Sequence, residues 1–170
     1  IHVLEQIRVS AGMEVKSDSG EAEKVPLTAN AYEDSIRYQN DSAVFTANGF
    51  VADQDRQDGI TDIFKNGWTA SQKGATITFE VEGNCIGIQY RKTIKLPAPV
   101  AEVVIDDDST HAVRLDANFD ETWGDKLQLD TIAEHIEKEK HKVQITITET
   151  HETDRLPFYL VSVIASGKEK

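Results

Sequence analysis

The sequence predicts an all-β fold, an antiparallel β-sandwich of the jelly-roll type with one short helix. Three segments alternate apolar and polar side chains along the chain: residues 75–81, 86–91 and 143–148. Alternation with a period of two is typical of strands that bury one face and expose the other to water. Turn signals such as Glu82-Gly83-Asn84 separate these segments, as expected for strands that fold back on one another.

The beginning of the chain predicts a different organisation from the rest. Residues 1–42 are mostly polar and are interrupted by Gly12, Gly20 and Pro26. We interpret them as an N-terminal segment that contains a linker from an upstream domain and an edge strand. The sandwich is then expected over residues 43–166, and residues 167–170 form a solvated tail.

Two further strand pairs follow the regular segments. Residues 100–105 and 111–115 flank a turn at residues 106–109, which is rich in Asp and Ser. Residues 141–149 and 158–165 form the closing pair. The last of these strands is apolar on both faces, so we expect it to lie beneath a cover on each side.

The short helix is predicted within residues 127–140. Leu129, Ile132, Ala133 and Ile136 recur at a helix-like spacing. Asp130 is placed as the N-cap of this helix, since a carboxylate can accept a hydrogen bond from the first free backbone amides.

Composition and charge narrow the possible functions. The chain has 170 residues, of which 39% are hydrophobic and 28% are charged, values that fit a globular domain. Its formal net charge of −12 disfavours nucleic acid and anionic membranes, because both are bound mainly through Lys and Arg. We therefore expect no nucleic-acid and no membrane partner, and a neutral polysaccharide or another protein domain remains as the partner.

The sequence offers no recognisable catalytic residue. It lacks the Gly-x-Ser-x-Gly elbow that exposes a nucleophilic serine. His141 shares the phase of the inward-facing residues of its strand, so we expect it to be buried and to bind a backbone carbonyl. His151 lies in a polar turn and is expected to be solvated, while Cys85 is expected to be a packed thiol.

One acidic loop contains residues of the type that bind calcium. Asp53, Asp55 and Asp58 lie within six residues and are followed by Gly59. Calcium prefers such oxygen ligands, but the spacing differs from that of an EF-hand loop. We expect an ordinary acidic loop and no cofactor, with a Ca²⁺ site at these three residues as the open alternative.

Aromatic residues give the stronger indication of ligand binding. Sugar rings pack their C–H faces on Trp and Tyr, while nearby polar groups bond the hydroxyls. Trp123 lies in a polar segment, where a large apolar ring is unexpected in a core. The predicted ligand-binding residues are Trp123, Asp120, Glu121, Asp125, Trp68 and Tyr38. For Trp68 the alternative is a packing role at the sandwich edge, and for Trp123 it is the anchoring of its loop.

The order of elements resembles a known family. The matching pieces are Gly67-Trp68, residues 74–83, residues 86–90, residues 103–106, residues 141–145 and residues 158–166. In their spacing they resemble the jelly-roll accessory domain joined to SGNH (GDSL-type) carbohydrate esterases, and more generally carbohydrate-binding modules. The resemblance implies that residues 1–9 could be the last turn of an upstream catalytic domain.

The resemblance implies a non-catalytic carbohydrate-binding or accessory module attached to a polysaccharide-acting esterase. It further implies an extracellular or cell-surface location in a bacterium, although the cysteine content leaves the cytoplasm open. Two alternatives remain at this point. The chain could dock a catalytic domain without binding sugar, or it could be an esterase fragment whose active site the motifs do not reveal.

Overall fold

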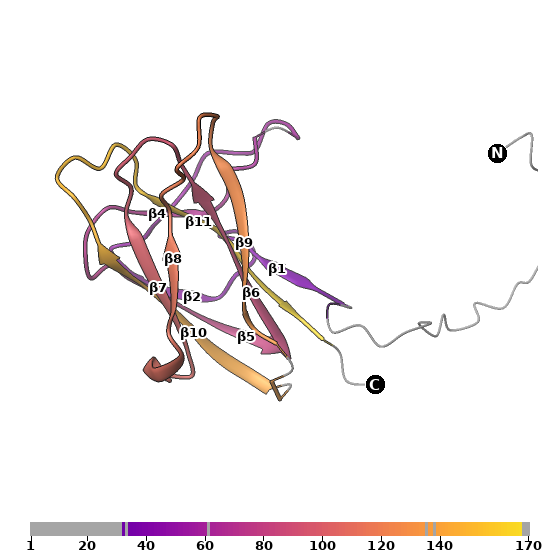
Figure 1. Ribbon diagram of the computed structural model, residues 1–170. Helices are drawn as coiled ribbons and strands as arrows, with labels where there is room; N and C mark the ends of the chain where they lie inside the picture. The colour runs from indigo at the N-terminus through magenta and orange to yellow at the C-terminus, as the bar shows by residue number, and fades with distance from the viewer. Residues whose placement is uncertain (1–31, 33, 61, 135, 138, 168–170) are drawn as a thin grey trace, which may run out of the picture.

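The computed structural model is a two-layer sandwich of antiparallel sheets. It describes residue 32 and residues 34–60, 62–134, 136–137 and 139–167. The segment that precedes residue 32, including the predicted end of an upstream domain at residues 1–9, lies outside the described residues. The two sheets face one another across the core, and the chain enters and leaves the sandwich at neighbouring positions (Figure 1).

The first sheet contains six strands. Its order is β3 (Val51–Ala52), β4 (Trp68–Ala70), β11 (Phe158–Ser166), β6 (Cys85–Lys92) and β9 (Lys126–Ala133), and β1 (Ile36–Tyr38) also pairs with β11. The second sheet has five strands, in the order β2 (Phe45–Asn48), β5 (Thr76–Gly83), β10 (Glu139–Glu149), β7 (Val100–Ile105) and β8 (Val113–Asp116). Within the described residues, β3 and β9 are therefore the edge strands of the first sheet, and β2 and β8 are those of the second.

Alternating residues of paired strands build the core. Ile77 and Phe79 of β5 and Val143 and Ile145 of β10 have at most 1% of their surface exposed. Between them, residues such as Thr78 and Gln144 face outward and pair across the two strands. The predicted all-β antiparallel sandwich is thus confirmed, and so is the pairing of β7 with β8 across the Asp-rich turn.

Strand β11 is buried on both faces, as its sequence predicts. Phe158, Leu160 and Val163 face the core, while Tyr159 and Val161 are buried on the other side. The loop that precedes β4 provides part of this cover, because the ring of Phe64 packs edge-on against Tyr159 with 6.3 Å between centroids.

The predicted helix at residues 127–140 is wrong. Residues 126–133 form strand β9, which pairs with β6, and residue 139 already begins β10. The helical element in the described part of the chain is a short 3₁₀ turn, η1 (Ser109–His111). Asp130, expected as an N-cap, instead accepts a hydrogen bond of 2.8 Å from the hydroxyl of Tyr90 on β6. Pairing along a long neighbouring strand thus outweighs a weak helical periodicity.

Other predictions about single residues are confirmed. Cys85 is buried, and His141 is only 4% exposed, with its Nε2 bound to the carbonyl of Glu137 at 2.9 Å. His151 lies in an exposed turn beside Asp154. Among the described residues, no helix is long and apolar enough to span a bilayer.

Candidate functional site

An exposed tryptophan marks one end of the sandwich. Trp123 lies in the loop between β8 and β9, at the upper end of the view in Figure 1, and 58% of its surface is exposed. Its ring meets Phe119 edge to face, with centroids 5.3 Å apart and planes at 88°. The ammonium of Lys126 lies 5.7 Å from the centre of the Phe119 ring. The indole is thus held by its own loop while a large part of it stays open to solvent.

Asp125 ties this loop to the neighbouring strand. One carboxylate oxygen accepts a hydrogen bond of 2.6 Å from the hydroxyl of Thr93, and the other lies 3.9 Å from Nε of Arg91. The guanidinium of Arg91 also donates to the carbonyl of Pro157 at 3.0 Å, in the loop between β10 and β11. A single cation therefore joins two of the loops at this end.

The same guanidinium lies over two aromatic rings. Its central carbon is 5.4 Å from the centre of the Tyr159 ring and 5.9 Å from that of Phe64. Burial lowers the pKa of Arg91 while Asp125 acts in the opposite direction, and the group remains a cation because the ordinary value is so high. Cation–π contacts of this kind are stronger where water is excluded.

Tyr159 extends the network to the acidic loop before β4. Its hydroxyl donates to Asp53 at 2.5 Å and accepts from the backbone amide of Gly67 at 3.3 Å. Burial, together with donation to Asp53, raises the pKa of this phenol, so it stays neutral at physiological pH. We call the connected group of Trp123, Phe119, Asp125, Arg91, Tyr159 and Phe64 the aromatic end.

The structure brings together only part of the predicted ligand-binding set. Asp120, Glu121 and Asp125 share the loop of Trp123, and the first two are exposed. Trp68 is fully buried and packs edge-on against Phe79 with 5.1 Å between centroids, so the prediction that it contacts a ligand is wrong. Tyr38 lies half-buried on β1 and packs against the core, so it is not an exposed platform like Trp123.

The three aspartates of the acidic loop do not converge. Asp53 is bound to Tyr159 and to the amide of Asp55, while the carboxylate of Asp55 pairs with Lys65 at 3.1 Å. In the described part of the chain, no three acidic, His or Cys side chains are grouped so that they could hold a metal ion. A tyrosine binds the carboxylate of Asp53 and a lysine binds that of Asp55 instead.

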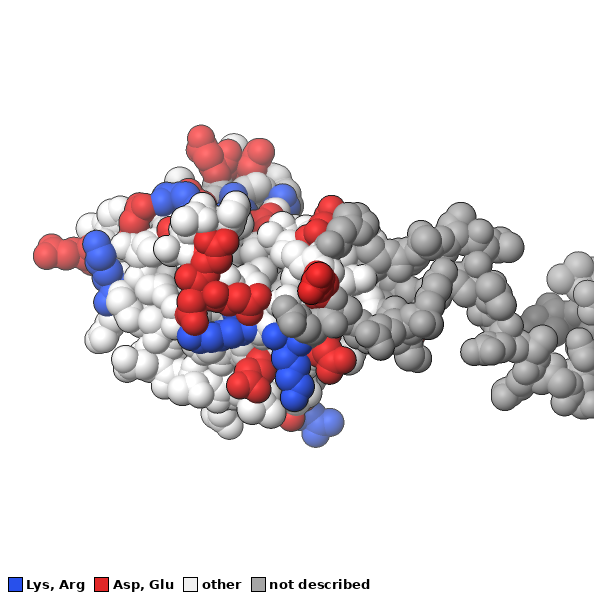
Figure 2. All heavy atoms as spheres, turned by 90° about the horizontal axis from the view of Figure 1, so that it is seen from below, with Lys and Arg blue, Asp and Glu red and all other residues white. Residues whose placement is uncertain are grey.

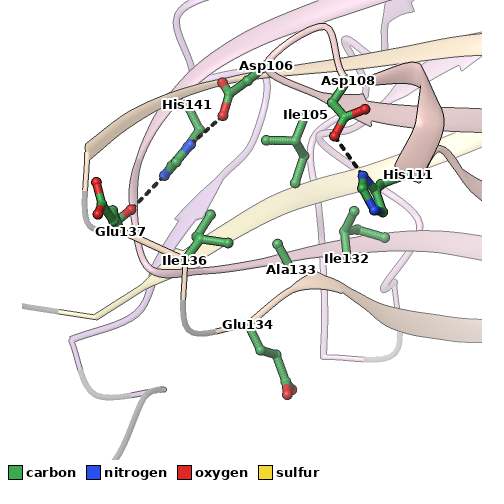
Figure 3. A pocket seen from close by; sticks show the side chains of 10 residues that line it. All are labelled: Ile105, Asp106, Asp108, His111, Ile132, Ala133, Glu134, Ile136, Glu137 and His141. Carbon is green, nitrogen blue, oxygen red and sulfur yellow. Dashed lines mark hydrogen bonds and ion pairs between the residues drawn. The ribbon is translucent and has the colours of Figure 1, made fainter.

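A pocket occupies the opposite end of the sandwich. It has a volume of about 540 Å³ and lies between the end of β7 with η1 and the segment that joins β9 to β10 (Figure 3). His141 bonds Asp106 at 2.7 Å on one side of it, and His111 bonds Asp108 at 2.7 Å on the other. We call this region the acidic end. Figure 2 looks at the molecule from below and shows acidic side chains spread over the visible face, with Lys and Arg side chains between them.

Sequence reasoning missed the pocket and the Arg91 network. The segment predicted as a helix contains Ile132, Ile136 and Glu137. Because a helix was expected there, the sequence did not predict that these residues and η1 line the same pocket. For Arg91, the available signal was an outward-facing cation near the end of a regular strand. Its aromatic partners come from residues 64 and 159, and no local pattern links those positions.

Comparison with solved structures identifies relatives of the chain. It is 56% identical to part of a two-domain esterase (CEX) active on acetylated mannans. The TM-score is 0.83 for the structure of that esterase co-crystallised with mannopentaose and 0.82 for a second structure of it. The match covers 99% of this chain but only 46% of the esterase, so the chain spans about half the length of that relative. No protein-family model matches the chain, and neither does any curated protein.

More distant structures share the fold. A family two carbohydrate esterase from Cellvibrio japonicus matches with a TM-score of 0.55 at 12% identity, over 79% of this chain and 34% of its own. A family 35 carbohydrate binding module from an environmental isolate matches with a TM-score of 0.52 at 16% identity, over 79% of this chain and 99% of its own.

These likenesses define the class of the protein. The chain matches one part of a two-domain esterase, and it shares its fold with whole carbohydrate-binding modules. The resemblance predicted from the sequence, to the jelly-roll domain of carbohydrate esterases, is confirmed.

Proposed function

We propose that this domain is a non-catalytic carbohydrate-binding module of a polysaccharide-acting esterase and that it binds neutral, mannan-type glycans at the aromatic end. The observation that supports this most directly is the 56% identity, over 99% of the chain, to part of an esterase active on acetylated mannans. The SGNH class of the attached catalytic domain and an extracellular, bacterial setting are part of the same proposal.

The aromatic end has the chemistry that a neutral sugar requires. The exposed indole of Trp123 offers an apolar face to the C–H groups of a pyranose ring. The carboxylates of Asp120 and Glu121, in the same loop, can accept hydrogen bonds from sugar hydroxyls. An interface with one ring is small, so we expect a Kd between about 1 μM and 1 mM.

The network beneath Trp123 supports this assignment. Arg91, Asp125 and Thr93 connect the Trp123 loop to β6 and to the loop that precedes β11. A loop held in this way loses little conformational freedom when a ligand binds, and such preorganisation raises affinity.

Affinity electrophoresis of the chain against soluble polysaccharides tests the proposal. We expect glucomannan and galactomannan to retard the protein and the Trp123→Ala variant to migrate as in a gel without glycan. Tyr32→Ala is the matched control, because Tyr32 is 55% exposed but does not belong to the aromatic end. Absence of retardation by every glycan would contradict the proposal, as would equal effects of the two substitutions.

A docking role is the second candidate function. The chain spans 46% of its two-domain relative, so a comparable length of that protein forms another part. Tyr32 and Leu129 are both about half exposed and line a shallow depression of about 50 Å³ together with Ile164 of β11. Tyr32 and Ile164 lie close in sequence to the two ends of the described chain, and these ends lie near one another in Figure 1. Retention of a separately expressed catalytic domain by the immobilised chain, lost on Leu129→Asp, would support this role.

A further inference from the structure

The pocket at the acidic end has the dimensions of a small-molecule site. Its volume of about 540 Å³ lies within the range of about 300–1,000 Å³ that is usual for ligand pockets. It opens between the end of β7 with η1 on one side and the segment that joins β9 to β10 on the other. It shares no lining residue with the aromatic end and is independent of the proposed glycan site.

The inner surface of this pocket is aliphatic. Ile105 comes from the end of β7, and Ile132, Ala133 and Ile136 come from the end of β9 and the segment after it. Figure 3 shows these side chains approaching from opposite sides into the space between the two His–Asp pairs. An apolar group of about four carbons placed there would lose its contact with water, and burying this apolar surface favours binding.

The rim of the pocket is acidic. Asp106 and Asp108 lie on one side, Glu134 and Glu137 lie on the other, and the lining residues that the structure describes include neither Lys nor Arg. Asp106 and Asp108 are held ionised, since hydrogen bonds keep the pKa of each below its usual range. A ligand at this rim therefore meets carboxylates, which accept hydrogen bonds and favour positive charge.

His141 neutralises only part of this charge. Its Nδ1 lies 2.7 Å from a carboxylate oxygen of Asp106, and its Nε2 lies 2.9 Å from the carbonyl oxygen of Glu137. Both partners are acceptors, so both ring nitrogens must donate and the ring is an imidazolium. The two nitrogens of this cation are turned to Asp106 and Glu137. On the opposite rim, the carboxylate of Glu134 accepts a hydrogen bond from the hydroxyl of Tyr32, a group that carries no positive charge.

We propose that this pocket binds an amphipathic cation, a short aliphatic body that carries a primary ammonium group. The aliphatic part fills the space among the three isoleucines, and the ammonium lies at the rim beside Glu134 and Glu137. A neutral molecule of the same shape gains only the apolar contact, and an anion is repelled. Free amines, amino sugars and the side chain of lysine all carry this ammonium group.

Titrations of the 170-residue chain, followed by ¹H–¹⁵N NMR, test the proposal. The probes are n-butylammonium, n-butanol and butyrate, at pH 7 and constant ionic strength. We expect n-butylammonium to give saturable shifts at residues 105–111 and 132–141 and to bind about tenfold more tightly than n-butanol. Butyrate should produce no shifts there. Equal affinity for the alcohol and the ammonium, or shifts confined to other regions, would overturn the proposal.

A pair of charge-removing variants sharpens the test. Glu134→Gln combined with Glu137→Gln should weaken n-butylammonium binding by about fivefold to tenfold and leave n-butanol binding unchanged. The matched control combines Glu80→Gln with Glu152→Gln, which removes the same charge from exposed positions outside the pocket. A preserved spectrum shows that each variant is folded. Equal weakening in both double variants would assign the effect to net charge and overturn the proposal.

Two further arms distinguish the natural source of the ammonium group. One uses glucosamine, and the other uses lysine blocked as an N-acetyl methylamide. Tighter binding of glucosamine than of n-butylammonium would support the proposal with an amino sugar as the source. Tighter binding of the blocked lysine would support it with a protein side chain as the source.

Discussion

The two ends of this sandwich differ in structure: loops joined by a cation cover one end, and a pocket lies at the other. At the aromatic end, Arg91 joins loops that are distant in sequence and supports an exposed indole. At the acidic end, the sheets remain apart and enclose a pocket with an aliphatic floor and an acidic rim. The comparison indicates that one β-sandwich can present a flat platform for a neutral ring and, at its other end, a cavity for a charged group.

The largest expected effect separates the core from the aromatic end. Trp68 is fully buried between the sheets, whereas Trp123 is 58% exposed. Trp68→Ala should lower the free energy of unfolding by about 3–5 kcal/mol, because it leaves a cavity among aromatic neighbours. Trp123→Ala should change it by only about 0.5 kcal/mol. Urea denaturation measures both values, and a large loss in the second variant would make Trp123 a packing residue.

The second prediction concerns the cation that connects the aromatic end. Arg91→Met keeps the aliphatic stem but leaves Asp125 and the carbonyl of Pro157 without this donor. We expect a loss of about 2–3 kcal/mol in the free energy of unfolding. Arg114→Met is the control, because Arg114 pairs with Glu149 on an exposed surface, where an ion pair contributes about 0–1 kcal/mol. Similar losses in the two variants would show that Arg91 does not hold the loops.

The third prediction concerns the buried histidine at the acidic end. His141→Phe keeps an aromatic ring, although a somewhat larger one, and removes the donors to Asp106 and to the carbonyl of Glu137. A loss of about 1–2 kcal/mol is expected, since two acceptors at the pocket then rely on water. His151→Phe, in an exposed turn, should have almost no effect in the same denaturation experiment. If both variants were equally stable, the His141 contacts would contribute nothing to the acidic end.

The smallest expected effect is a pH dependence located at the acidic end. Burial acts to raise the pKa of Asp106, but hydrogen bonds from His141 and from the amide of Lys142 outweigh it and lower the pKa below 3.8. The stabilisation is therefore complete above pH 3.8 and is lost as the pH falls through the lower, folded-state value. Because 47% of the Asp106 side chain is exposed, the effect should be small.

Asp106→Asn isolates this dependence. Thermal unfolding between pH 2 and pH 6 should show a shallower acid slope for Asp106→Asn than for the unchanged chain. Asp107→Asn, whose carboxylate pairs with Lys142 on the surface, is the matched control. A slope that is identical in the two variants would contradict the role given to the His141–Asp106 pair.

The sequence predicted the fold and the aromatic end better than the acidic end, and the reason is physical. Alternation along residues 75–81 and 143–148 reports directly which side chains face the core. Likewise, the polar neighbours of Trp123 in the sequence indicate that its side chain is exposed. By contrast, residues 127–140 show an ambiguous period, and only pairing with β6 determines that residues 126–133 form a strand. The error concealed the pocket, because the pocket depends on where Ile132 and Ile136 lie relative to Ile105.

Trp68 shows a second limit of local reasoning. Its neighbours Asn66 and Gly67 suggest a loop, yet it begins β4 and packs against Phe45 and Phe79 from the other sheet. Those contacts join residues far apart in sequence, so the burial of this ring was not visible in its own segment.

Calorimetric titration of the chain with mannopentaose tests the central claim most directly. We expect a Kd between about 1 μM and 1 mM and its loss on Trp123→Ala, with binding retained in the control Tyr32→Ala. Mannopentaose binding that survives Trp123→Ala, or no detectable heat at millimolar concentration, would contradict a glycan site at the aromatic end.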